Sequence, residues 1–159
     1  MEIVINPNDI KSRNIIFHLP VKNANDKFKN YYKIIYSNSE YSMKYVLIEL
    51  NFAKYEIKYN HSTHTYNLFV DKNDEFMNNI KKVEYNILSV INRRIQKNIV
   101  YSCFNEVKKK TFLYHFKFHP NIFQLYLKIS GVWEDDNNVG LVYKIYYNTS
   151  TEKLFNIIC

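Results

Sequence analysis

Apolar and polar residues alternate along much of this chain of 159 residues. The alternation is clearest in Leu127–Trp133 and Val139–Tyr147, which the polar stretch Glu134–Asn138 separates. A period of two residues is typical of half-buried strands, so this region predicts a β-hairpin. Both glycines of the chain, Gly131 and Gly140, fall inside these strands. Because glycine in a strand marks a bulge, a bend or a close approach, we expect a strongly bent hairpin, as in a small closed barrel.

Further strands are predicted along the rest of the chain, where β-branched and aromatic residues are frequent. A charged turn is expected at Asn105–Lys110 and an exposed loop at Asn23–Asn30. The expected strands are Ile3–Ile5, Ile15–Leu19, Tyr31–Tyr36, Tyr41–Phe52, Lys54–Tyr59, Tyr66–Val70, Ile99–Phe104, residues 112–118 and Leu154–Ile158.

The period changes to three and four residues between Phe76 and Ile95, which predicts one long helix over Asp74–Gln96, capped at Asn73 or Asp74. This helix follows three good strand candidates. A barrel of five strands that carries its helix between the third and fourth strands is an OB-fold. We therefore expect a mainly β (α+β) chain with an OB-like small barrel of five or more antiparallel strands. Residues 1–159 are expected to form a single nucleic-acid-binding domain, in which 1–30 are an irregular N-terminal extension.

Charge and composition narrow the class of partner. The net charge of +7 and the pI near 9.2 favour a polyanion such as nucleic acid. Only three of the 22 basic residues are arginine, and Lys, Asn, Ile and Tyr are abundant, so an A/T-rich coding sequence is a competing explanation of the charge. The 15 tyrosines and 11 phenylalanines must either fill a core or stack on a ligand.

Several classes of protein are not supported by the sequence. The two cysteines match no metal or redox spacing, and the start of the chain has no signal-peptide pattern, so we expect an intracellular protein, in the host cytoplasm or nucleus for a viral one. No stretch is apolar enough to cross a membrane. No phosphate-binding loop or nucleophile motif is present, and the pairs His61/His64 and His115/His119 lack further ligands. We expect no enzyme, cofactor or metal.

Ile129–Trp133 and Gly140–Ile145 together resemble the carboxy-terminal hairpin of phage-type replicative single-stranded DNA-binding proteins and of their relatives in large DNA viruses. In that family a tryptophan ends one barrel strand, a glycine opens the next, and a lysine follows three or four positions on. Trp133, Gly140 and Lys144 occupy those places here. The resemblance implies an OB-fold that coats single-stranded DNA without sequence preference during viral DNA replication, repair or recombination.

The chain departs from that family in two ways. The family's members typically end in an acidic tail that recruits replication proteins, whereas this chain ends in Lys153–Cys159. The acidic residues Glu134, Asp135 and Asp136 lie at the expected hairpin tip, where they would repel phosphates. We therefore expect these three carboxylates to point away from any bound strand.

Binding to a single strand requires cations along the backbone and aromatic rings for the bases. One orientation of the two expected strands places the alternate row from Tyr55 to Val70 in the core. Lys54, Lys58 and Phe69 would then share the exposed face. In the opposite orientation, the tyrosines of that row form the exposed surface on which bases stack. Tyr59 could reach a base from its strand end in either orientation. The expected nucleic-acid-binding residues are Lys54, Lys58, Tyr59, Phe69, Lys108, Lys109, Lys110 and Lys117.

Structural explanations of the same residues stay open. Lys108–Lys110 could be an ordinary solvated turn, and the aromatic row of residues 112–118 is more typical of a core strand than of a binding surface. The expected partner is single-stranded DNA, with RNA as a competing ligand, replication proteins as further partners and a homo-oligomer as the assembly. The alternative function is a non-enzymatic viral structural or protein-interaction module, such as a minor virion component or a replication accessory.

Overall fold

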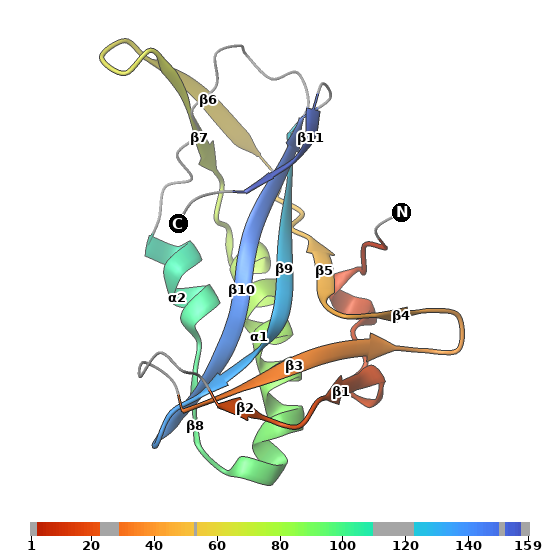
Figure 1. Ribbon diagram of the computed structural model, residues 1–159. Coiled ribbons are helices and arrows are strands. Elements are labelled where there is room, and N and C mark those ends of the chain that lie inside the picture. Colours follow the sequence, from red (N-terminus) through yellow and green to blue (C-terminus); the bar gives the residue numbers. More distant parts are fainter. Residues whose placement is uncertain (1–2, 23–28, 53, 110–122, 150–151, 157–159) are drawn as a thin grey trace.

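The computed structural model describes residues 3–22, 29–52, 54–109, 123–149 and 152–156. Its framework is a long curved hairpin of β9 (Phe123–Glu134) and β10 (Asn138–Thr149) (Figure 1). On the other edge of β9, β5 (Val46–Glu49) pairs with the first half of the strand and β3 (Asn30–Ser37) with the second half. The predicted hairpin at Leu127–Tyr147 is therefore confirmed.

Shorter strands complete a nine-stranded sheet around this hairpin. β8 (Asn98–Val100) and β11 (Glu152–Asn156) pair with β10, and β8 is parallel to it. The sheet curls into a half-barrel, so the mainly β class with a barrel-like sheet is confirmed. The strands β1 (Ile15–Phe17), β2 (Val21–Lys22) and β4 (Ser42–Met43) all pair with β3, and the 3-10 turns η1 (Pro7–Asp9) and η2 (Ser12–Asn14) precede them.

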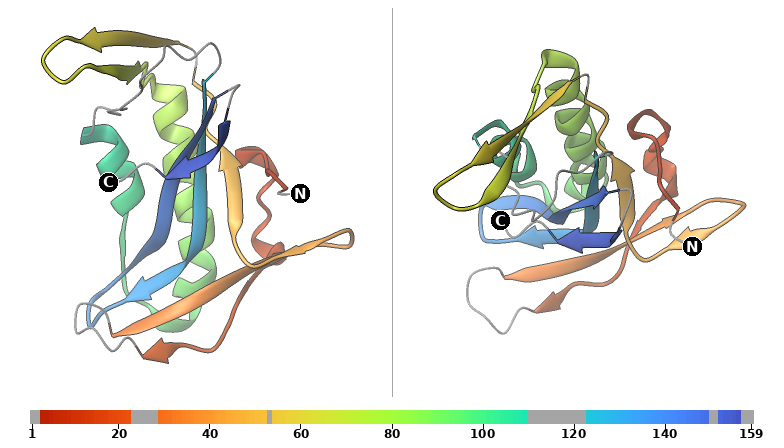
Figure 2. Two further views of the ribbon diagram at one scale, coloured as in Figure 1. Left: turned by 45° about the horizontal axis from the view of Figure 1, so that its top comes forward. Right: turned by 90° about the horizontal axis from the view of Figure 1, so that it is seen from above.

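The helix α1 (Asp74–Ile95) covers one face of the sheet, which we call the inner face (Figure 2). The Asn73 side chain caps it by accepting a hydrogen bond from the Phe76 backbone N–H at 2.9 Å. Gln96 ends the helix in the left-handed conformation, with φ of 50°. The predicted helix and its cap are confirmed. The core between helix and sheet contains Phe76, Ile80, Val83, Ile87, Ile91, Ile48, Leu125, Leu127, Ile129 and Ile145.

A second helix, α2 (Ser102–Lys109), replaces the strand that we predicted at Ile99–Phe104 and the charged turn at Asn105–Lys110. Only Asn98–Val100 forms a strand. The cause is the carboxylate of Glu84 in α1, which is fully buried and accepts hydrogen bonds from the backbone N–H groups of Cys103 and Phe104, both at 3.0 Å. A carboxylate at this position satisfies N–H groups that a helix leaves without partners in its first turn.

The strands β6 (Tyr55–Asn60) and β7 (Thr65–Val70) form a separate two-stranded sheet that projects beyond the end of α1 (Figure 1). Seven described strands therefore precede α1, and β6 and β7 do not belong to the curled sheet. The row from Tyr55 to Val70, which one of the two expected orientations placed in the core, is only partly buried. Ile57 and Val70 pack against the core, whereas Tyr55 and Tyr59 are each 41% exposed.

Some of the predicted elements lie outside the residues that the structure describes. These are residues 112–118 and almost all of Asn23–Asn30. The N-terminal segment 1–30 is less irregular than expected, because it supplies β1 and β2 to the sheet. No helix in the described parts of the chain has the length and apolar character needed to cross a membrane.

Candidate functional site

The face of the sheet opposite α1, which we call the outer face, carries a row of aromatic and lysine side chains. Cross-strand pairing places Lys128 of β9 directly beside Lys144 of β10 and Leu47 of β5. The next row along contains Tyr126 and Tyr146 as direct partners. We call the whole surface the aromatic face; it comprises Tyr31, Lys33, Tyr45, Tyr126, Lys128, Trp133, Lys144 and Tyr146.

Two lysines directly opposite each other repel, and such pairs destabilise a sheet. Here Lys128 is held over tyrosine rings, with its Nζ 3.9 Å from the centroid of Tyr45 and 5.7 Å from that of Tyr146. Lys144 is exposed and forms no ion pair with a described residue, and the same is true of Lys33. The sheet thus keeps positive charge on this face although neutral side chains would stabilise it more.

The two glycines allow aromatic rings to lie flat on this face. A Cβ atom at Gly140 would come within 2.4 Å of the Trp133 indole, and one at Gly131 within 2.5 Å of the Tyr31 ring. Such covering of a strand glycine by a ring on the neighbouring strand stabilises bent sheets. The Tyr31 hydroxyl also donates to the Ser130 carbonyl at 2.9 Å, which fixes its ring. Both rings are half-buried and so keep part of their surface toward solvent.

Gly131 also marks an irregularity that bends the hairpin. The pairing of β9 with β10 shifts by one residue between Val142 and Tyr143, directly beside Gly131. A Cβ atom at this glycine would meet the Tyr32 carbonyl oxygen at 2.4 Å, because β3 crosses close to the backbone here. A bulge of this kind increases the local twist of a strand. The aromatic face therefore follows a curved sheet.

The first acidic residue of the hairpin tip faces inward, away from the aromatic face. Glu134 is buried and accepts hydrogen bonds from Asn30 Nδ2 at 2.7 Å and from the Tyr32 hydroxyl at 2.6 Å, and it pairs with Lys97. Burial alone would raise the pKa of Glu134, but these hydrogen bonds outweigh it and hold the pKa below its ordinary value. Burial, together with the bond to Glu134, raises the pKa of Tyr32 to about 12.

The other two acidic residues of the tip are also engaged locally. Asp136 forms an exposed ion pair with Lys29 at 2.9 Å. Asp135 accepts hydrogen bonds from the backbone N–H groups of Asn137 and Asn138, which lowers the pKa of its carboxyl. These bonds shape the turn between β9 and β10.

The predicted residues Lys54, Lys58, Tyr59 and Phe69 belong to the projecting β6–β7 hairpin and not to the aromatic face. Lys58 and Phe69 share one face of it, as expected, and the Lys58 Nζ lies 5.2 Å from the Phe69 ring centroid. Lys58 also pairs with Glu56 at 3.2 Å. Tyr59 lies on the opposite face, where its hydroxyl contacts His64 Nδ1 at 3.2 Å.

The predicted lysines of the 108–117 region are only partly described. Lys108 and Lys109 are exposed in the last turn of α2, so they belong to a helix and not to the charged turn that we expected. Lys110 and Lys117 lie outside the described residues. The structure therefore does not bring all eight predicted residues together on one surface.

The sequence analysis did not predict the aromatic face, although β9 shows part of the pattern that forms it. The row of Gln124, Tyr126 and Lys128 on β9 alternates with the apolar core row, although Tyr126 itself is buried. The neighbours of this row on β3 and β5 come from far away in the chain. Only the strand register shows that tyrosines and lysines from four segments meet.

Comparison of this chain with protein-family models, with curated proteins and with solved structures gives no match.

Proposed function

We propose that this chain binds single-stranded nucleic acid, above all single-stranded DNA, without sequence preference, and that it does so through the aromatic face. The observation that carries the proposal is the placement of four half-buried rings beside lysines on one face of the sheet; the rings are those of Tyr31, Tyr45, Trp133 and Tyr146. Aromatic rings stack on bases of every kind, since every base has a π face, and lysines bind the phosphates between them. The net charge of +7 favours the same partner.

The biological setting is proposed from the hairpin resemblance. Trp133, Gly140 and Lys144 all lie on the aromatic face, which gives these three residues a common surface. A curled half-barrel is compatible with an OB-like barrel. We propose that the chain acts without catalysis in viral DNA replication, repair or recombination, as a homo-oligomer that coats the strand.

Trp133 provides a direct test, because it is the only tryptophan of the chain. Titration with an unstructured deoxythymidine oligomer should quench its fluorescence as a base stacks on the indole. Affinity should fall steeply between about 50 and 200 mM salt, with a slope of about −0.7 for each phosphate contacted. Duplex DNA serves as the control and should bind much more weakly. A uridine oligomer in parallel measures whether RNA competes.

Two results would contradict the proposal. One is unchanged tryptophan fluorescence together with no binding of a labelled oligonucleotide in an anisotropy assay. The other is binding that does not respond to salt. Trp133→Phe is the matched variant for the anisotropy assay, since it keeps an aromatic ring and removes the fluorescence signal.

A second candidate function, a protein-interaction module, is favoured by one different observation. Leu19 is 87% exposed, Val21 63% and Ile16 52%, and they lie beside a groove of about 360 Å³ between the N-terminal strands and α1. Exposed apolar side chains gathered in one place often mark contacts with other proteins. Under this candidate the protein binds no oligonucleotide, and Leu19→Asp should abolish its self-association in sedimentation experiments. Under the first candidate the protein binds an oligonucleotide, and Leu19→Asp should leave that binding unchanged.

A further inference from the structure

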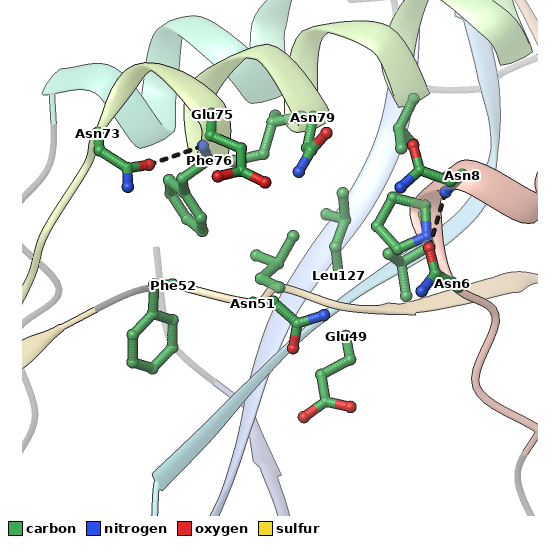
Figure 3. A pocket seen from close by; sticks show the side chains of 15 residues that line it. Asn6, Asn8, Glu49, Asn51, Phe52, Asn73, Glu75, Phe76, Asn79 and Leu127 are labelled. Carbon is green, nitrogen blue, oxygen red and sulfur yellow. Dashed lines mark hydrogen bonds between the residues drawn. The ribbon is translucent and has the colours of Figure 1, made fainter.

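A pocket of about 310 Å³ lies between the first turns of α1, the end of β5 and the N-terminal turn η1, on the side of the sheet that α1 covers (Figure 3). Its wall on the helix side includes Asn73, Glu75 and Asn79, and its wall on the strand side includes Glu49 and Asn51. Its volume lies within the range of small-molecule sites. Its base is formed by the buried apolar side chains of Ile48, Leu50, Phe76, Ile80, Val83 and Leu127.

The rim of the pocket presents amide donors. The Asn73 Oδ1 is occupied by the Phe76 N–H, the Asn6 Oδ1 by the Asn8 N–H, and the Asn8 Oδ1 by the Lys82 Nζ at 3.3 Å. Each of these side chains therefore keeps its Nδ2 group as a donor, and no described residue accepts from it. Asn51 and Asn79 likewise form no side-chain hydrogen bond with a described residue.

The charge of the pocket is opposite to that of the whole chain. Its described lining includes Glu49 and Glu75 but no lysine or arginine, in a protein with a net charge of +7. The Glu75 carboxylate lies at the helix-side wall, whereas Glu49 Oε1 accepts a hydrogen bond from Gln124 Nε2 at 3.2 Å and points away from the pocket. The Glu75 carboxylate repels a phosphate beside it and accepts hydrogen bonds from neutral donors. The pocket therefore offers both donors and acceptors to a neutral ligand.

We infer that this pocket binds an uncharged nucleobase, either of a free nucleoside or of an unstacked base in a nucleic-acid strand. A planar base has two apolar faces and carries its donors and acceptors on its edge, which matches an apolar base with a polar rim. Asparagine amides pair with such edges in protein–DNA complexes. Phe52, half-buried at the wall, adds an aromatic ring. A sugar carries hydroxyl groups all around its ring, so the apolar base of the pocket would leave several of them without partners.

Calorimetric titration with adenosine, guanosine, cytidine and thymidine, each compared with its 5′-monophosphate, tests the inference. At least one nucleoside should bind, and its monophosphate should bind about tenfold more weakly because of the Glu75 carboxylate. Glu75→Gln should remove this difference. Asn79→Leu should weaken nucleoside binding about tenfold, since it removes a hydrogen bond to the base.

Asn78→Leu is the matched control. Asn78 is the exposed neighbour of Asn79 on the same helix and does not line the pocket, so the same substitution there should leave binding unchanged. The inference is overturned by the absence of binding for all four nucleosides, by equal effects of the two leucine variants, or by glucose competing as well as the nucleosides do.

The source of the base is decided by competition. A saturating nucleoside that weakens oligonucleotide binding identifies a base of the strand as the occupant, and one that leaves it unchanged identifies the free nucleoside. Nucleoside binding does not depend on the proposed function. The chain can bind nucleosides and fail to quench Trp133 with oligonucleotides, or the reverse, so the two proposals fail separately.

Discussion

The aromatic face and the β6–β7 hairpin both combine aromatic rings with lysines, but they differ in what supports them. The aromatic face lies on a nine-stranded sheet with α1 packed behind it, and the glycine contacts fix two of its rings. The β6–β7 hairpin is a sheet of only two strands. Two-stranded sheets are at best marginally stable alone, so this one depends on contacts at its base, such as those of Phe52 with Tyr55 and Phe76.

The comparison shows that residue types alone do not identify the stronger candidate for the nucleic-acid-binding surface. A ring that neighbouring atoms already fix loses little conformational freedom when a base stacks on it, whereas ordering a less constrained ring costs free energy. Lys58 is also partly neutralised by Glu56, while Lys144 has no described ion-pair partner. We therefore expect the aromatic face to contribute most of the binding free energy.

Reversing two charges on each surface should give the largest difference in oligonucleotide affinity between the two surfaces. Lys128→Glu/Lys144→Glu should weaken oligonucleotide binding about a hundredfold, because it replaces two phosphate contacts by repulsion. Lys54→Glu/Lys58→Glu on the hairpin should weaken it less than about fivefold. Fluorescence anisotropy of a labelled oligonucleotide at one salt concentration measures both. Equal losses for the two double variants would contradict the comparison.

Substitution of the glycines tests the rigid support of the aromatic face. Gly131→Ala should lower the free energy of unfolding by about 3 kcal/mol, because its methyl group meets a backbone oxygen that cannot move away. Gly140→Ala should cost only about 1 to 2 kcal/mol, since only the Trp133 side chain must shift. Urea denaturation gives both values. A Gly131 variant as stable as the Gly140 variant would show that β3 does not approach as closely as described.

The weaker support of the hairpin is tested by removing one ring at its base. Phe52→Ala deletes the edge-on contacts with Tyr55 and Phe76, whose ring centroids lie 5.6 and 6.5 Å away. It should loosen the hairpin by about 1 kcal/mol. Amide hydrogen exchange should then accelerate in β6 and β7 while β9 and β10 stay protected. Uniform acceleration across both sheets would mean that the hairpin unfolds only together with the rest of the chain.

The smallest expected effect concerns the pH dependence of the hairpin tip. Because the pKa of Glu134 is held below its ordinary value of 4.5, its carboxylate stabilises the fold above that pH. This stability is lost as the pH falls through the lowered pKa, when the carboxylate is protonated in the folded state. Urea denaturation at neutral and acidic pH should show a smaller acid-induced loss in Glu134→Gln than in the original chain. An unchanged loss would assign the acid sensitivity to other carboxylates.

Local patterns in the sequence were sufficient to predict the long helix and the long hairpin. The helix from Asp74 and the hairpin around Gly131 and Gly140 were predictable because their periods extend over many residues. The helix α2 was not, because its N-terminus is completed by Glu84 in a different helix. The spacing of Cys103 and Val107, four residues apart and both buried, was the available local sign of that helix.

The candidate site was predictable only in its composition. Sequence reasoning expected aromatic and lysine residues to share a surface, and placed that surface on the strands that form the β6–β7 hairpin and on the lysines between residues 108 and 117. The aromatic face needs Tyr31 from β3 and Tyr45 beside β5 to lie against β9, and these long-range pairings cannot be read from a local pattern. The pocket below β5 depends on the same long-range arrangement.

The central position of β9 in the sheet has a consequence for how the chain folds. β3 and β5 both precede α1, but β5 pairs along its length with β9, and β3 does so over Asn30–Lys33, although β9 follows both helices. During synthesis the ribosome releases the earlier strands long before their partner exists. Their hydrogen-bonding groups are then exposed edges that can join other chains. Folding must therefore wait until β9 has been translated, and chaperones that shield nascent chains should determine how much of this protein reaches its native state.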